Sequence, residues 1–132
     1  MKYNAFTTEE VKKLLTVGGK IADSAIIMLY TGMRVSEMLD VKCSDIDLSA
    51  KAICVHSKKD GNRVLPIPDV LLPIIKRNMG NKYLINEMYG QYNSKFRMLM
   101  KELELKHTPH ECRHTFLQKC HQNGIAEGVN MR

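Results

Sequence analysis

Residues 21–30 are apolar on most sides when they are placed on a helix, so the rest of the chain has to pack around them. A helix without a polar face is buried in a core. It should end at Thr31 and Gly32, because glycine readily adopts the left-handed conformation that closes a helix. Arg34 follows directly, so the sequence predicts a guanidinium beside the core, with Glu37 one helical turn further on and able to orient it.

The rest of the pattern indicates further helices and a small sheet. The helices are expected to start at Thr7, to span residues 71–78, to include residues 96–103 and to start again at Thr108. Strands are expected at residues 44–48, 52–57 and 63–67, with a short one at 83–85. The turn sequence Asp60-Gly61-Asn62 joins two of these strands into a hairpin. The predicted fold is therefore α+β, a mainly helical domain with a small antiparallel three-stranded sheet.

The helix that begins at Thr108 has clear start signals. Thr108 suits the N-cap, Pro109 suits the first helical position, and Glu111 completes a capping box. His110 and Arg113 then share one face near the helix N-terminus, where backbone N–H groups lack helical partners. A guanidinium, an imidazole and a helix N-terminus together suit a phosphate. The alternative is an ordinary surface helix with a His and an Arg on its solvated side.

The composition indicates one domain and a polyanionic partner. The 132 residues suffice for a single core, and the net charge of +6 favours a negatively charged partner. The longest apolar run, residues 25–30, is too short to cross a membrane, and no apolar signal segment precedes the first helix, so we expect an intracellular protein. The four cysteines form no C-x-x-C pair, and the spacing of His110, His114, Cys120 and His121 matches no recognised zinc module, so no metal site is predicted.

Three separated segments form a recognisable set. Residues 31–37 read Thr-Gly-Met-Arg-Val-Ser-Glu, Lys58 lies in the hairpin before residues 63–68, and residues 108–116 contain His-x-x-Arg. In this order the segments resemble the first arginine box, the β-hairpin lysine and the H-x-x-R box of the tyrosine recombinases, the phage integrase family. The resemblance covers nearly the whole chain. It implies the integrase-like catalytic core, with residues 1–132 as a single catalytic domain.

The resemblance implies an enzyme that breaks and rejoins DNA through a 3′-phosphotyrosine, with no metal, no other cofactor and no small-molecule substrate. It implies catalytic roles for Arg34, Lys58, His110 and Arg113, and supporting roles for Glu37 and His114. Contacts to DNA are expected from Arg34, Lys58, Lys59, Arg63, His110 and Arg113. The implied partner is a double-stranded recombination site, bound by a homo-tetramer of the full-length protein in the bacterial cytoplasm.

The chain also departs from the family pattern. Its five tyrosines all precede residues 108–116, whereas the family's nucleophilic tyrosine follows that box. The family's N-terminal DNA-clamping domain has no counterpart before Thr7. We therefore expect the chain alone to form no covalent adduct with DNA and to be inactive. The rival interpretations are a non-enzymatic DNA-binding module, a type IB topoisomerase-like enzyme, and a structural or zinc-binding domain.

Overall fold

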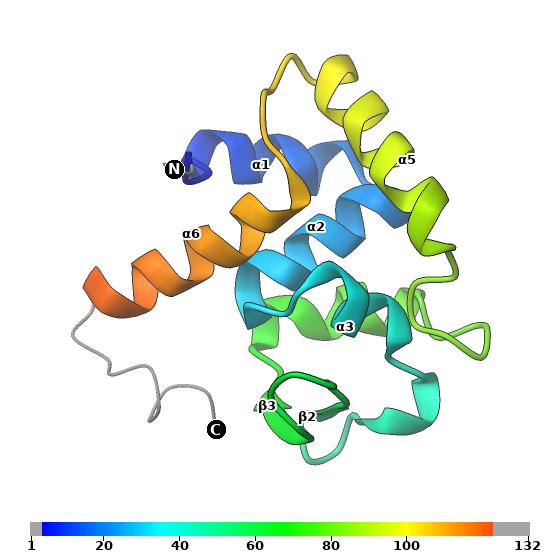
Figure 1. Cartoon of the computed structure of the whole chain (residues 1–132). Helices are drawn as coiled ribbons and strands as arrows, with labels where there is room; N and C mark the ends of the chain where they lie inside the picture. Colours follow the sequence, from blue (N-terminus) through cyan, green and yellow to red (C-terminus); the bar gives the residue numbers. More distant parts are fainter. Residues whose placement is uncertain (1–3, 123–132) are drawn as a thin grey trace.

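A computed structural model describes residues 4–122 of the chain (Figure 1). Its helices are α1 (Thr8–Val17), α2 (Lys20–Thr31), α3 (Val35–Asp40), α4 (Leu72–Arg77), α5 (Tyr89–Glu102) and α6 (Pro109–Gln122). Its strands are β1 (Ile46–Asp47), β2 (Ala52–Val55) and β3 (Arg63–Pro66), flanked by the short 3₁₀ helices η1 (Cys43–Asp45) and η2 (Asp69–Leu71). This confirms the predicted α+β fold, mainly helical with a small three-stranded sheet.

Helix α2 lies at the centre of the core, as its apolar sequence predicts. Most of its residues are buried, and α1, α5 and α6 all contact it (Figure 1). Ile26, Ile27 and Met28 are completely or almost completely shielded from solvent. Gly32 ends the helix in the left-handed conformation, with φ 76° and ψ 10°. The chain can therefore turn sharply out of the core and begin α3 within a few residues.

The three strands form an antiparallel sheet in the order β1–β2–β3. Ile53 of β2 pairs with Ile46 of β1 on one side and with Leu65 of β3 on the other. The antiparallel pairing of β2 with β3 confirms the predicted hairpin, and Ile53 and Leu65 are buried in the core. The first strand is shorter than predicted because η1 precedes it, and there the Asp45 carboxylate accepts the Lys42 N–H at 3.0 Å.

Residues 83–85 do not form the short strand that the sequence suggests. Tyr83 makes one isolated bridge with Lys42, and the next N–H, that of Leu84, donates to the Val41 carbonyl oxygen at 3.0 Å. Leu84 is buried although its segment is irregular. The apolar character of this segment therefore reflects packing against the core rather than membership of the sheet.

Both predicted helix starts are confirmed. At α1, the Thr7 hydroxyl accepts the Glu10 N–H at 3.1 Å and the Glu10 carboxylate accepts the Thr7 N–H at 2.9 Å, which is a complete capping box. At α6, the Glu111 carboxylate accepts the Thr108 N–H at 3.1 Å. The Glu111 N–H donates to the Thr108 carbonyl oxygen at 3.0 Å. The carboxylate half of the α6 capping box is therefore present.

Segments that are far apart in the sequence meet on one side of the fold. Figure 1 shows α3 between the start of α6 and the β2–β3 hairpin. The ring of Phe116, on α6, packs so tightly on Gly32 that any Cβ at position 32 would overlap it. Glycine is therefore required there by space as well as by φ, and this contact fixes α6 against the turn before α3. Among residues 4–122, no helix has the length and apolar character needed to cross a bilayer.

Candidate active site

Arg34 occupies the N-cap of α3, directly after the turn at Gly32. Its backbone N–H donates to Glu37 Oε1 at 3.0 Å, and its Nη1 donates to Glu37 Oε2 at 3.1 Å. The same Nη1 also bonds to the carboxylate of Asp60, at the tip of the β2–β3 hairpin. Its side chain is 30% exposed. The guanidinium is therefore fixed at the edge of the core while one side of it remains open to solvent.

Glu37 is the carboxylate that organises this corner of the fold. Its side chain is 3% exposed, and it accepts hydrogen bonds from Arg63 Nη1 at 3.2 Å and Arg63 Nη2 at 3.0 Å. Burial raises the pKa of Glu37, but hydrogen bonds from Arg63, from the Arg34 N–H and from Ser57 outweigh burial and lower the pKa to about 2. Glu37 is therefore ionised at neutral pH and holds Arg34 in place. The guanidinium of Arg63, expected at DNA, is engaged here with an internal partner.

Arg113 extends from the first turns of α6 toward the turn before α3. Its Nη1 donates to the carbonyl oxygen of Gly32. The opposite face of α6 is fixed in the core, where Cys112 is fully buried and the Thr115 hydroxyl accepts the Phe6 N–H at 2.8 Å. The helix thus buries one face and presents Arg113 from the other.

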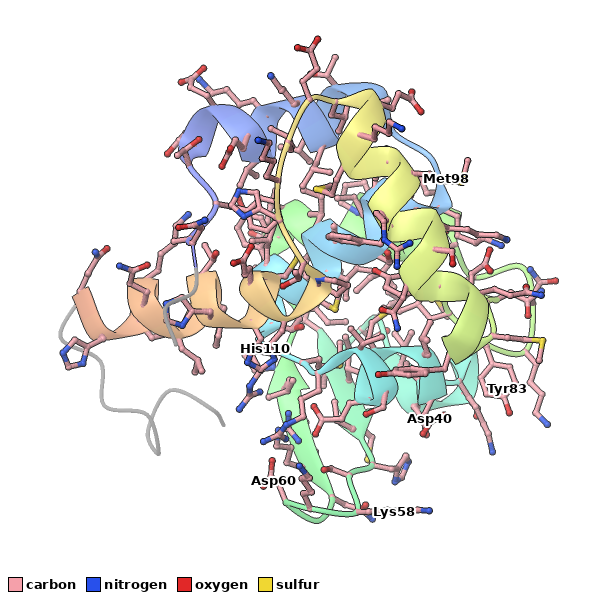
Figure 2. The ribbon with its side chains drawn as sticks, turned by 45° about the horizontal axis from the view of Figure 1, so that its top comes forward. Asp40, Lys58, Asp60, Tyr83, Met98 and His110 are labelled. Carbon is pink, nitrogen blue, oxygen red and sulfur yellow. The ribbon has the colours of Figure 1, made fainter. Side chains whose placement is uncertain are left out.

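Arg34, His110 and Arg113 line one cleft of about 300 Å³. The other described residues around it are Met33, Val35, Ser36, Tyr89, Asn93, Thr108 and Pro109. The cleft therefore lies where the starts of α3, α5 and α6 meet. Figure 2 shows His110 at the start of α6, above the β2–β3 hairpin. The three basic side chains come from two distant segments of sequence, so tertiary packing creates the site.

Positive charge accumulates in this cleft. Burial lowers the pKa of Arg113, and the neighbouring guanidinium of Arg34 lowers it further. Burial also lowers the pKa of His110, and the charge of Arg113 adds to that effect. Positive groups that disfavour one another's charge are stabilised by an anion placed among them. A phosphodiester, with two non-bridging oxygens, has the charge and geometry that paired guanidiniums bind.

Lys58 and Lys59 line an adjoining cavity of about 370 Å³. Arg34 and Ser36 line both cavities, so the two are neighbours. In Figure 2 the Lys58 side chain, at the tip of the hairpin, points away from His110. The fold therefore brings Arg34 and His110 into one cleft and leaves Lys58 beside it. The described residues that line these two cavities do not include His114, whose supporting role stays a prediction.

Two residues of this region are not predicted by the sequence analysis. Tyr89, which is 57% exposed, lines the cleft and also a neighbouring cavity of about 510 Å³. It begins α5, whose N-cap is Met88, so no Ser, Thr, Asp or Asn marks this helix start. Asp60 lies 26 residues from Arg34 in the sequence. The residues around it indicate a turn and give no sign of a contact with Arg34.

The side chains weighed as zinc ligands lie along α6. His110 lines the cleft, whereas Cys120 is buried, so the two lie in different environments. Within residues 4–122, no group of three or more His, Cys, Asp or Glu side chains is placed to hold a metal ion.

Comparison with known proteins assigns the family. Residues 4–129 match the phage integrase family. The chain belongs to this family. Tyrosine recombinase XerA of Pyrococcus furiosus is 35% identical over 140 residues, which cover 92% of this chain and 49% of that protein. Tyrosine recombinase XerA of Thermococcus onnurineus is 34% identical over 140 residues, covering 92% of this chain and 50% of that protein. The chain thus spans about half the length of these relatives.

Solved structures share the fold. A crystal structure of XerA recombinase matches with a TM-score of 0.79 and 25% identity, covering 96% of this chain and 53% of that chain. The structure of the Tn1549 transposon integrase in complex with transposon right end DNA matches with a TM-score of 0.80 and 20% identity, covering 99% of this chain and 58% of that chain. A lambda integrase tetramer bound to a Holliday junction matches with a TM-score of 0.77 and 16% identity, covering 99% of this chain and 46% of that chain. These matches confirm the predicted integrase-like fold, and they include transposon and phage proteins.

Proposed function

We propose that this chain is the phosphate-binding core of a site-specific DNA recombinase, which breaks and rejoins duplex DNA through a 3′-phosphotyrosine intermediate. The observation that carries the proposal is the meeting of Arg34, His110 and Arg113 in one cleft. Membership of the phage integrase family supports it, as do related folds whose structures contain DNA. The proposed partner is a double-stranded recombination site in the bacterial cytoplasm, bound by a homo-tetramer of the whole protein.

The two arginines would bind the non-bridging oxygens of one phosphate. Cleavage increases the negative charge on these oxygens, so donors that bind more tightly in the transition state accelerate the reaction. Arg34 and Arg113 stay charged at every working pH and offer planar forks of N–H donors. Loss of one such donor typically slows a reaction by about 10²- to 10³-fold.

His110 and Lys58 would move protons at the same phosphate. The lowered pKa of His110 leaves its imidazole neutral at neutral pH, so it can accept the proton of an attacking hydroxyl. Lys58 is the proposed acid for the departing 5′ oxygen, and Lys59 is the second choice. Both line the adjoining cavity, so the hairpin has to shift before Lys58 reaches the leaving group.

None of the chain's own tyrosines is proposed as the nucleophile. The five are Tyr3, Tyr30, Tyr83, Tyr89 and Tyr92. Burial raises the pKa of Tyr92, whose hydroxyl lies 2.7 Å from Ser24 Oγ, so this phenol is unsuited to attack. Tyr89 lines the cleft and is therefore the tyrosine to test. On this proposal the chain alone binds DNA without cleaving it.

A suicide DNA substrate, nicked so that a cleaved strand stays attached, tests that expectation. The wild-type chain should form no adduct that survives denaturation, because the proposed nucleophile is not among these tyrosines. An adduct that forms with the wild type and disappears in Tyr89→Phe would contradict the proposal and identify Tyr89 as the attacking group.

Binding to a short DNA duplex tests the phosphate site itself. Affinity should fall steeply as salt rises, because phosphate contacts release counterions. Arg113→Gln should weaken binding about tenfold or more, since a hydrogen bond to a charged group contributes about 1.5–3 kcal/mol. Lys12→Gln removes the same charge from an exposed position on α1 and should bind like the wild type. Binding that neither salt nor Arg113→Gln weakens would contradict the proposal.

A further inference from the structure

Asp60 places a carboxylate on the guanidinium of Arg34, a side chain of the proposed phosphate site. Arg34 Nη1 bonds to both Asp60 and Glu37. The hairpin turn presents Asp60 in this position, because the Asp60 N–H donates to Ser57 Oγ at 3.2 Å and the Gly61 N–H donates to the Ser57 carbonyl oxygen at 2.9 Å. The tip of the hairpin is therefore tied to the start of α3 through an ion pair.

The two carboxylates on Arg34 differ in how firmly they are built into the fold. Glu37 is almost completely buried and also accepts two hydrogen bonds from Arg63. The side chain of Asp60 is 45% exposed, on a turn at the surface. Solvent and ions reach Asp60 readily, and an exposed ion pair of this kind is weak. Glu37 is thus a permanent partner of Arg34, whereas Asp60 is a replaceable one.

We propose that Asp60 competes with DNA phosphate for Arg34 and ties down the lysine hairpin until DNA arrives. A carboxylate and a phosphodiester both offer paired oxygens to a guanidinium, so one can take the place of the other. A phosphate bound at Arg34 competes for the same guanidinium and repels Asp60, which breaks the tie. Release of Asp60 then frees the hairpin to carry Lys58 toward the cleft. This inference rests on the proposed function and couples DNA binding to movement of the hairpin.

The orientation of the hairpin and its charges support this coupling. In Figure 2, Asp60 and Lys58 lie at the hairpin tip, and the Lys58 side chain points away from His110. The Arg34 guanidinium holds the pKa of Asp60 below its usual value, and the Asp60 carboxylate in turn raises the pKa of Arg34. Both groups are therefore charged at neutral pH, so an arriving phosphate has to displace an ionised carboxylate.

Asp60→Asn tests the competition while keeping a residue that suits the turn. Its matched control is Asp69→Asn, because Asp69 is an exposed aspartate whose carboxylate pairs with Lys51 at 2.8 Å. Both variants gain one unit of positive charge, but only the first frees Arg34. Asp60→Asn should bind a DNA duplex about three- to fivefold more tightly than Asp69→Asn, the size expected for an exposed ion pair. Equal affinities would overturn the inference.

A second measurement needs no DNA. Hydrogen exchange of the Gly61 amide, which bonds to Ser57, reports how firmly the hairpin tip is held. Its protection factor should fall severalfold in Asp60→Asn and stay at the wild-type value in Asp69→Asn. Unchanged protection in Asp60→Asn would overturn the inference. If the wild-type chain does not bind DNA although the Gly61 amide loses protection in Asp60→Asn, the proposed function is contradicted and the contact between Asp60 and Arg34 is not. Failure of the inference and failure of the proposed function are therefore distinguishable.

Discussion

His107 and His110 lie about one helical turn apart at the start of α6, and their surroundings are opposite. His107 is 5% exposed, with Nδ1 2.9 Å from Glu111 Oε1 and Nε2 2.9 Å from Glu10 Oε1. Its ring stacks on Phe6, with centroids 3.9 Å apart. Each ring nitrogen therefore faces a carboxylate of the same chain, so this side chain has all its partners within the fold.

His110 faces the cleft, where like charges meet. Burial lowers its pKa, and the charge of Arg113 lowers it further. Polar side chains that find their partners within the chain stabilise the fold, whereas like charges gathered in a cleft suit an external anion. His107 fastens the N-terminal segment to α6, and His110 marks the place where function is expected.

Removing each imidazole in turn tests whether the two histidines contribute differently to stability, and the expected difference is large. His107→Ala leaves the Glu10 and Glu111 carboxylates without the ring nitrogens that lie 2.9 Å from them. The free energy of unfolding should fall by about 3–5 kcal/mol, because each of the two lost hydrogen bonds to a carboxylate contributes about 1.5–3 kcal/mol. His110→Ala removes a group whose charge the fold disfavours, and stability should change by less than about 0.5 kcal/mol. Equal losses in thermal unfolding would show that the two histidines play the same role.

Glu37 pairs with Arg34 and Arg63 beside the cleft, and its pKa of about 2 predicts an acid-sensitive stability. Because this value lies below the ordinary 4.5, the ionised carboxylate stabilises the fold above pH 4.5, and the contribution is lost as the pH falls from 4.5 to about 2. One pKa unit corresponds to about 1.4 kcal/mol, so the contribution is roughly 3 kcal/mol. Glu37→Gln should be less stable at neutral pH and lose less stability in acid than the wild type.

Urea unfolding of both proteins at neutral and at acid pH measures this difference. Glu111→Gln is the comparison variant, because it alters the carboxylate beside His107 instead. The pKa of Glu111 is also lowered, although burial alone would raise it. If Glu37→Gln lost as much stability in acid as the wild type, the Glu37 carboxylate would not be the acid-sensitive group beside the cleft.

The pH dependence of DNA binding should show a smaller effect, which depends on His110. Phosphate favours the imidazolium, so binding raises the pKa of His110 from its lowered value in the free protein. Affinity should therefore rise a few-fold as the pH falls below the ordinary 6.5, within the limit of about tenfold per pH unit for one bound proton. His110→Ala should lose this rise. His56→Ala, which removes an exposed histidine on the sheet side, should keep it.

Much of the fold follows from local sequence. The apolar run of α2, its closing Gly32 and the capping box at Thr7 are short-range signals, and the structure has each of them. The same holds for the hairpin, since strand alternation and turn residues lie close together in the sequence. The strand predicted at residues 83–85 is wrong, because apolar composition alone does not distinguish a strand from a buried irregular segment.

The candidate site could be predicted only in part, because its partners are fixed by packing. The segments holding Arg34 and Arg113 were recognisable as motifs, and the fold brings both to one cleft. The Asp60 contact with Arg34 and the Arg63 contact with Glu37 join residues 26 apart, and neither leaves a local pattern. Contacts of this kind depend on how α3 and the hairpin pack, so structure is needed to find them.

The proposed site requires Arg34 and Arg113 to bind the same phosphate, and a double-mutant cycle on DNA affinity measures whether they do. Arg34→Lys and Arg113→Lys keep the charge but lose the planar fork of donors. Groups that share one partner are coupled, so the two losses should be non-additive by about 0.5–3 kcal/mol. Strictly additive losses would contradict the account, because they would mean that the two guanidiniums do not act on a common phosphate.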